Sequence, residues 1–124
     1  MTLLLRLVAL LALPLLAACA GHPGGPPPGT PQDKARLEQA ILALGPGIAP
    51  AEASRAAQIA YDHTYQLSRE YQITDPPIVH NTKVNMGLKP RGLCWHWAKD
   101  IEDRLNLENF ATLRMHRAIA NADN

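Results

Sequence analysis

Apolar residues recur at helical spacing near the start of the hydrophilic part of this chain. Leu37, Ile41 and Leu44 repeat every three or four residues, which predicts an amphipathic helix. The stretch Thr30-Pro31-Gln32-Asp33 supplies its start. Threonine caps a helix, proline suits the first position, and an aspartate three residues after the cap completes a capping box. Gly45 is expected to stop this helix.

A longer helix is predicted from residue 50 to about residue 71, after a Gly-Pro-Gly turn. Pro50 suits its first position. One stripe of this helix combines small and apolar residues, and the small ones would let another helix approach closely. The stripe consists of Ala53, Ala57, Ala60, Thr64, Leu67 and Tyr71.

A third amphipathic helix is predicted from residue 94 to about residue 106. Its packing face holds Cys94, Trp97, Ala98, Ile101 and Leu105. The opposite face holds His96, Lys99, Asp100 and Asp103 and is expected to be solvated.

Two other segments of the domain lack the spacing of apolar residues that is typical of an amphipathic helix. Residues 72–91 contain prolines and turn formers that argue against a continuous helix, and residues 78–79 and 82–84 are expected to be short extended pieces. Residues 110–120 alternate in polarity, which favours a half-buried strand, although the alanines also allow a helix. The predicted class is therefore α+β and mostly helical, with one or few strands at the C-terminus.

The N-terminus carries an apolar leader. Residues 7–18 are too short to cross a bilayer and follow the positive Arg6, as in a secretory signal. The closing Leu16-Ala17-Ala18-Cys19 resembles the lipobox of bacterial lipoproteins, and the alternative is an ordinary signal peptide with a chance cysteine. The resemblance implies cleavage before Cys19, acylation of Cys19, and, because Ala20 follows, a location in the outer membrane facing the periplasm.

These features divide the chain into three parts. Residues 1–18 form the signal peptide, residues 19–31 the lipidated cysteine and a Gly/Pro-rich tether, and residues 32–124 a small domain. The tether is expected to be extended and to hold the domain up to about 30 Å from the bilayer. The membrane is thus one expected partner.

Charge excludes one class of partner. The chain has 12 basic and 11 acidic residues, and Arg6 lies in the leader, so the mature protein is balanced. No basic run or basic face with interleaved aromatic residues is present, and nucleic-acid binding has no electrostatic support. With Cys19 lipidated, Cys94 is the only free thiol.

Cys94 is the candidate nucleophile. It lies in the first turn of its predicted helix, where unpaired N–H groups stabilise a thiolate or a developing oxyanion. Catalysis also requires a histidine within hydrogen-bond reach. The alternative is that Cys94 is a small apolar residue on the packing face.

A longer stretch carries a second resemblance. The pattern His80-Asn81 … Val84-Asn85 … Gly87 … Arg91-Gly92-Leu93-Cys94-Trp95-His96-Trp97-Ala98 resembles proteobacterial lipoproteins with a transglutaminase-like, papain-type thiol-hydrolase fold. This implies that Cys94 opens a helix packed on an antiparallel sheet, with a histidine and an acid on later strands. The given sequence stops before such strands, so a truncated or degenerate relative is expected.

The histidines in the chain are weak substitutes for the catalytic base. His96 is about 200° around the helix from Cys94 and should point away. His116, on the predicted strand, is a weak catalytic candidate. His80 is expected to hydrogen-bond the loop backbone, although it could cap the site. Trp97 is expected in the core, and Trp95 is expected to be a structural anchor or to flank a groove beside the thiol.

Three functions remain open at this point. The chain is interpreted as a lipid-anchored, degenerate or truncated relative of thiol hydrolases, and catalysis by this chain alone is not expected. One alternative is a non-catalytic envelope lipoprotein that binds a protein partner or a second copy. The other is an active cysteine hydrolase or acyltransferase that takes its base from a longer chain or a partner. No cofactor is expected, and no metal site, because Cys94 and His96 lie on opposite helix faces.

Overall fold

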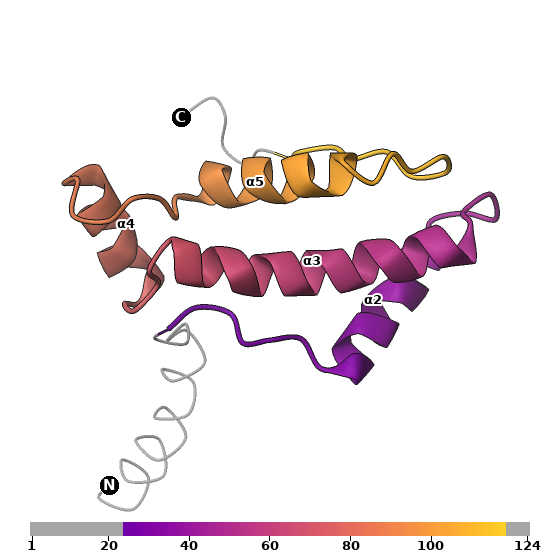
Figure 1. Ribbon diagram of the computed structural model, residues 1–124, viewed down its shortest axis with the longest axis horizontal. Helices are drawn as coiled ribbons and strands as arrows, with labels where there is room; N and C mark the ends of the chain where they lie inside the picture. Colours follow the sequence, from indigo (N-terminus) through magenta and orange to yellow (C-terminus); the bar gives the residue numbers. More distant parts are fainter. Residues whose placement is uncertain (1–23, 119–124) are drawn as a thin grey trace, which may run out of the picture.

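The computed structural model describes residues 24–118, so the predicted signal peptide and Cys19 lie outside the described residues. Four helices are present in the described part: α2 (Pro31–Leu42), α3 (Pro50–Glu70), α4 (Pro77–Asn85) and α5 (Cys94–Asn106). Figure 1 shows α3 in the middle, with α5 along one side and α2 on the other. The prediction of a mostly helical protein is confirmed.

Helix α2 begins as the sequence predicts. The Thr30 hydroxyl accepts a hydrogen bond from the Asp33 N–H at 3.1 Å, and the Asp33 carboxylate accepts one from the Thr30 N–H at 3.0 Å. The helix ends at Leu42, before Gly45. Leu44 therefore lies beyond the helix and is 78% exposed, so the prediction that it belongs to the apolar face of this helix is wrong.

Helix α3 provides most of the core. Ala53, Ala57, Leu67 and Tyr71 are buried, as the predicted stripe requires, and Ala56 is buried with them. The other two members of the stripe are half-buried. Because the buried positions are mainly alanines, α2 and α5 can both pack closely against α3.

Helix α4 corrects the prediction for residues 72–91. The two segments expected to be extended, 78–79 and 82–84, both lie inside this helix. Pro76 is its N-cap and Pro77 its first residue, where no backbone N–H is needed. The first helical hydrogen bond runs from the His80 N–H to the Pro76 carbonyl at 2.9 Å. The prolines thus start a helix here instead of preventing one.

The predicted strand over residues 110–120 is also wrong. Residues 113–118 have no regular secondary structure, and no strand occurs between residues 24 and 118. Positions 119 and 120 lie outside the described residues. The N–H groups of Ala111 and Thr112 donate to the Glu52 carboxylate at 2.7 and 2.8 Å. A side chain of α3 therefore takes the place of a neighbouring strand.

The described part of the tether lies against α3. Figure 1 shows it running along α3 from near α4 to the start of α2. A Cβ atom at Gly29 would come within 2.4 Å of the Tyr61 ring, and one at Gly25 within 3.1 Å of Ile73 and Ser68. Glycine allows this close approach. Residues 25–29 therefore do not add to the distance between domain and membrane as the extended tether was expected to do.

None of the helices described between residues 24 and 118 has the length and apolar character needed to span a bilayer.

Candidate functional site

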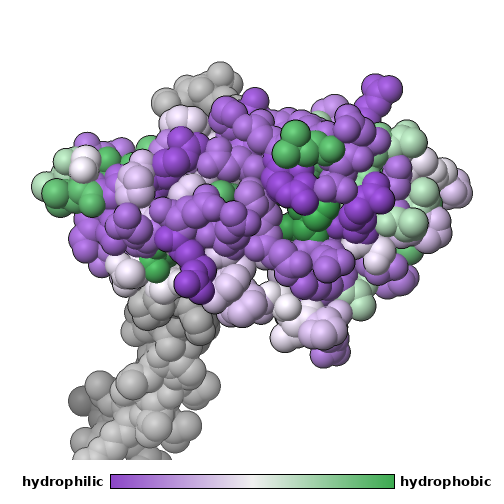
Figure 2. Space-filling model, in the orientation of Figure 1, coloured by the Kyte–Doolittle hydropathy of each residue, from purple (hydrophilic) through white to green (hydrophobic). Residues whose placement is uncertain are grey.

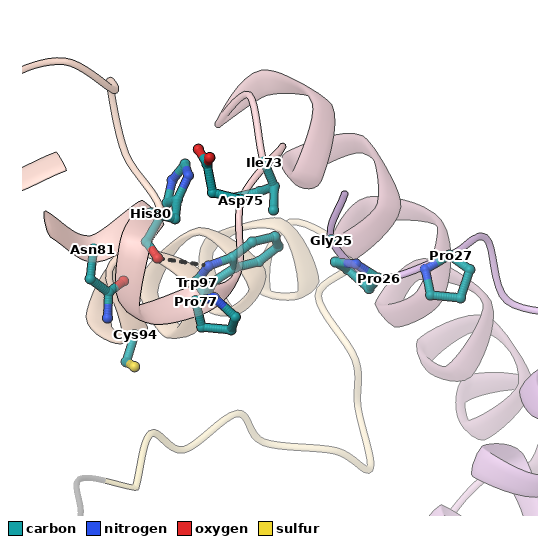
Figure 3. A pocket seen from close by; sticks show the side chains of 11 residues that line it. Gly25, Pro26, Pro27, Ile73, Asp75, Pro77, His80, Asn81, Cys94 and Trp97 are labelled. Carbon is teal, nitrogen blue, oxygen red and sulfur yellow. Dashed lines mark hydrogen bonds between the residues drawn. The ribbon is translucent and has the colours of Figure 1, made fainter. Parts of the chain in front are cut away.

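Cys94 is the first residue of α5 and its side chain is exposed. It lies at the rim of a largely apolar cavity of about 350 Å³ between the tether, α4 and the start of α5 (Figure 3). The residues that line this cavity are Gly25, Pro26, Pro27, Ile73, Asp75, Pro77, His80, Asn81, Gly92, Cys94 and Trp97.

The predicted faces of α5 are partly reversed at its first turn. His96, expected in solvent, is 7% exposed, and Cys94, expected in the packing face, is exposed. Because the two residues are about 200° apart on the helix, turning His96 inward forces Cys94 outward. Farther along, Leu105 is buried and Lys99 and Asp103 are exposed, as predicted.

His96 caps its own helix. Its Nδ1 atom accepts hydrogen bonds from the N–H groups of Gly92 and Leu93, both at 3.1 Å. The Leu93 N–H is the N-cap donor, which a helix N-terminus leaves unpaired, and the Gly92 N–H directly precedes it. An Nδ1 that accepts two hydrogen bonds carries no proton, and burial together with the positive charge of Arg91 lowers the pKa of His96. The ring is thus held neutral and engaged with the backbone.

His80 holds the preceding residue. Its Nε2 lies 2.8 Å from the Arg91 carbonyl oxygen, and since a carbonyl can only accept, Nε2 carries the proton. The ring is 1% exposed, and its Nδ1 is buried without a hydrogen-bond partner. The predicted hydrogen bond from His80 to the loop backbone is confirmed. In Figure 3 the Cys94 thiol points away from this ring.

Gly92 lets His80 approach the backbone closely. Its φ of +125° lies in the region that favours glycine, and an added Cβ would lie 2.4 Å from Nε2 of His80. The Gly92 carbonyl accepts a hydrogen bond from the Trp97 indole at 3.1 Å. Residues 91–93, called here the Gly92 turn, are therefore fixed from three sides by His80, His96 and Trp97.

A half-buried ionic network closes the other side of the turn. The Asp100 carboxylate accepts hydrogen bonds from the Tyr71 hydroxyl at 2.5 Å and from the Arg91 guanidinium at 2.8 and 3.1 Å. Burial and the Asp100 hydrogen bond raise the pKa of Tyr71 to about 12. Burial alone would raise the pKa of Asp100, but the bonds from Tyr71 and Arg91 outweigh it and the pKa is lowered. The expectation that Asp100 is simply solvated is wrong.

The two tryptophans differ from the expectation, because Trp97 and not Trp95 lies beside the cavity. Trp97 is half-buried, lines the cavity and packs edge-on against Tyr71 with ring centroids 4.7 Å apart. Trp95 is 57% exposed. Its ring lies against His96 at 3.9 Å and beneath the Arg91 guanidinium at 5.9 Å. Trp95 thus covers the outer side of the Gly92 turn and does not line the cavity.

His116 is not brought to Cys94. It is exposed and lies beside Ala98, Ile101 and Leu105 of α5, in a separate shallow hollow. Within residues 24–118, no three His, Cys, Asp or Glu side chains converge as metal ligands would.

The groups that the sequence reasoning missed are those of the turn and its network, above all Gly92, Arg91 and Asp100. One signal was available. His96 is the third residue of α5, where a side-chain acceptor often reaches back to the N-cap N–H.

Comparison with known proteins found no matching family model, no matching curated protein and no matching solved structure.

Proposed function

We propose that this chain is a lipid-anchored envelope protein whose domain acts by binding and is a degenerate relative of transglutaminase-like thiol hydrolases. The resemblance of residues 80–98 implies a cysteine at the start of a helix, and Cys94 opens α5. The lipobox-like Leu16-Ala17-Ala18-Cys19 supports the anchor. Its expected place is the outer membrane facing the periplasm, with an envelope protein or a second copy as binding partner.

One observation supports binding over catalysis: both histidines near Cys94 are committed to the backbone. His96 accepts the N–H groups of Gly92 and Leu93, and His80 donates to the carbonyl of Arg91. The remaining His80 nitrogen is buried. A nucleophilic cysteine needs a base within hydrogen-bond reach. The unprotonated nitrogen of His96 already accepts two backbone N–H groups, and the unprotonated nitrogen of His80 is buried and makes no hydrogen bond with the Cys94 thiol.

The anchor is tested by the intact mass of the protein extracted from its native membrane. The proposal predicts the mass of residues 19–124 plus acyl chains on Cys19. An unmodified chain that retains residues 1–18 would contradict it.

The binding role is tested by replacing Cys94 in the anchored protein. Cys94→Ala should leave envelope phenotypes and co-purifying proteins unchanged, because the thiol takes part in no described hydrogen bond. A phenotype of Cys94→Ala that matches deletion of the gene would contradict the proposal.

A second candidate is a cysteine hydrolase or acyltransferase that takes its base from a partner or from residues outside the described ones. The observation in its favour is the exposure of Cys94 at a helix N-terminus beside a cavity. An electrophilic peptide probe for cysteine hydrolases separates the two functions. Labelling of Cys94 in intact membranes but not in the purified protein would favour this candidate, and equal weak labelling in both would favour the binding role.

A further inference from the structure

One face of α4 exposes large apolar side chains. Ile78 is 82% exposed, Met86, the C-cap, 67%, and Val79 43%. Positions 78, 82 and 86 lie above one another on a helix, with position 79 beside them. This outer face of α4 is opposite the buried His80. Leu88, 64% exposed, follows it directly, and Figure 2 shows a hydrophobic patch at the α4 end of the molecule.

The exposed side chains on this face of α4 are larger than most of the side chains buried in the core. The buried positions of α3 are mostly alanines, so the protein places several of its largest aliphatic side chains outside. No described residue covers them. Clustered exposed apolar side chains mark a surface that contacts another apolar phase or a partner.

The tether brings this face close to Cys19. Gly25, Pro26 and Pro27 share the cavity with Pro77, His80 and Asn81 of α4, so the described chain begins beside α4. Five residue steps separate Cys19 from Gly24, a reach of at most about 18 Å. Helix α4 is about 10 Å wide and about 13 Å long. This reach exceeds the width of α4, so an acylated Cys19 can bring the outer face of α4 to the bilayer, whereas α3, about 31 Å long, places its first residues well away.

Charge is compatible with a membrane surface. Between Asp75 and Asp100 the chain has no acidic residue and four basic ones, Lys83, Lys89, Arg91 and Lys99. Asp75 offsets Lys83 through an ion pair at 2.8 Å, and the Lys89 ammonium lies on the Gln72 carbonyl. The segment that presents the apolar face thus carries no negatively charged side chain, which phosphate headgroups would repel.

We infer that the outer face of α4, with Leu88, inserts into the headgroup region of the bilayer that holds the lipid anchor. The acyl chains supply attachment, and insertion of the exposed apolar side chains fixes the orientation of the domain. The Gly92 turn and Trp95 are then held close to the membrane surface. This inference rests on the lipid anchor of the proposed function.

The test places a tryptophan on the outer face. Protein carrying Met86→Trp and Trp95→Phe is purified in lipidated form and reconstituted into phosphatidylethanolamine–phosphatidylglycerol vesicles with brominated acyl chains, which quench tryptophan at the depth of the boundary. The control carries Leu44→Trp and Trp95→Phe. Leu44 is as exposed as the α4 residues but follows α2, away from the tether's start.

The inference predicts quenching of the Met86→Trp protein at least about twofold stronger than that of the control, consistent with burial about 5–10 Å deep. Equal quenching of the two proteins would overturn it, including the case in which a second copy covers α4. The acyl mass is measured on the same samples. A missing acyl mass refutes the anchor, whereas an acylated protein with equal quenching refutes the docking of α4 alone.

Discussion

The two sides of the segment that joins α4 to α5 are built in opposite ways. On the inner side, polar groups are buried and paired: two histidines bind the backbone of the Gly92 turn, and Asp100 holds Tyr71 and Arg91. On the outer side, Ile78, Met86 and Cys94 are exposed. Buried, hydrogen-bonded polar groups fix a shape, and exposed apolar groups are available for contact. The inner side therefore maintains the turn, whereas the outer side is the one that the inferred contact with the membrane would use.

The largest expected effect comes from adding a methyl group to the inner side. Gly92→Ala places a Cβ against His80 and forces alanine to φ +125°, which should destabilise the fold by about 3 kcal/mol. Urea denaturation measures the change. Gly87→Ala is the matched control, because its φ is +73° and nothing lies near the added Cβ. It should cost about 1 kcal/mol, and equal losses would mean that the histidine packing contributes nothing.

Removing one hydroxyl from the ionic network should have an intermediate effect. Tyr71→Phe deletes the hydrogen bond to Asp100 and leaves the Arg91 pair in place. The expected loss of stability is about 1.5 kcal/mol, typical of a hydrogen bond to a charged group. Asp103→Asn breaks an exposed ion pair with Lys99 on the same helix and should cost less than about 0.5 kcal/mol. Similar losses for the two variants would contradict a special role for the inner side.

The pH dependence of stability should reveal the His96 cap. The folded state lowers the pKa of His96, so below about pH 6.5 the unfolded chain binds the proton more readily. Stability should be complete above that pH and decline as pH falls through the lower folded-state pKa. The pKa of Asp100 is also lowered in the folded state, so stability should fall again as pH decreases below about 4.

His96→Gln sharpens that test, because glutamine at the third helical position can accept the same N–H groups without titrating. At pH 7 the variant should lose less than about 1 kcal/mol. Denaturant midpoints between pH 5 and pH 8 should vary less for the variant than for the natural chain. Parallel pH profiles would show that His96 is not the group responsible.

The smallest effect is expected at the far end of α3. Glu52→Ala removes the acceptor for the Ala111 and Thr112 N–H groups, so the hydrogen exchange of these two amides should accelerate about tenfold or more. Glu70→Ala, which removes an exposed partner of Gln66, should leave them unchanged. Unchanged exchange in Glu52→Ala would mean that the carboxylate does not hold this segment.

The sequence predicted the helices whose signals are local. Thr30, Pro31 and Asp33 marked the start of α2, and the alanine stripe marked α3. It failed where a distant group decides the outcome. The alternation after residue 110 predicted a strand, but the Glu52 carboxylate, about 60 positions earlier, takes the backbone hydrogen bonds. The prolines before α4 occupy N-cap and first position, so the same residues that argued against a helix begin one.

In the candidate site, too, local signals were predicted correctly and the effects of distant groups were not. The position of Cys94 at the start of a helix followed from local pattern, whereas its outward direction depends on His96 turning inward against Tyr71 and the Gly92 turn. Periodicity treats histidine as polar and places it in solvent. It has no information about the unpaired N–H groups that make burial of this ring favourable.

The most direct test of the account is the alkylation rate of Cys94 by iodoacetamide, measured from pH 5 to pH 9 on the acylated protein and on its His96→Gln and His80→Asn variants. If both histidines serve the turn and not the thiol, the profile of each folded variant should match that of the natural chain within about threefold. A fall of about tenfold or more in a folded variant, the size expected when a catalytic base is lost, would show that a histidine activates Cys94 and would contradict the binding role proposed here.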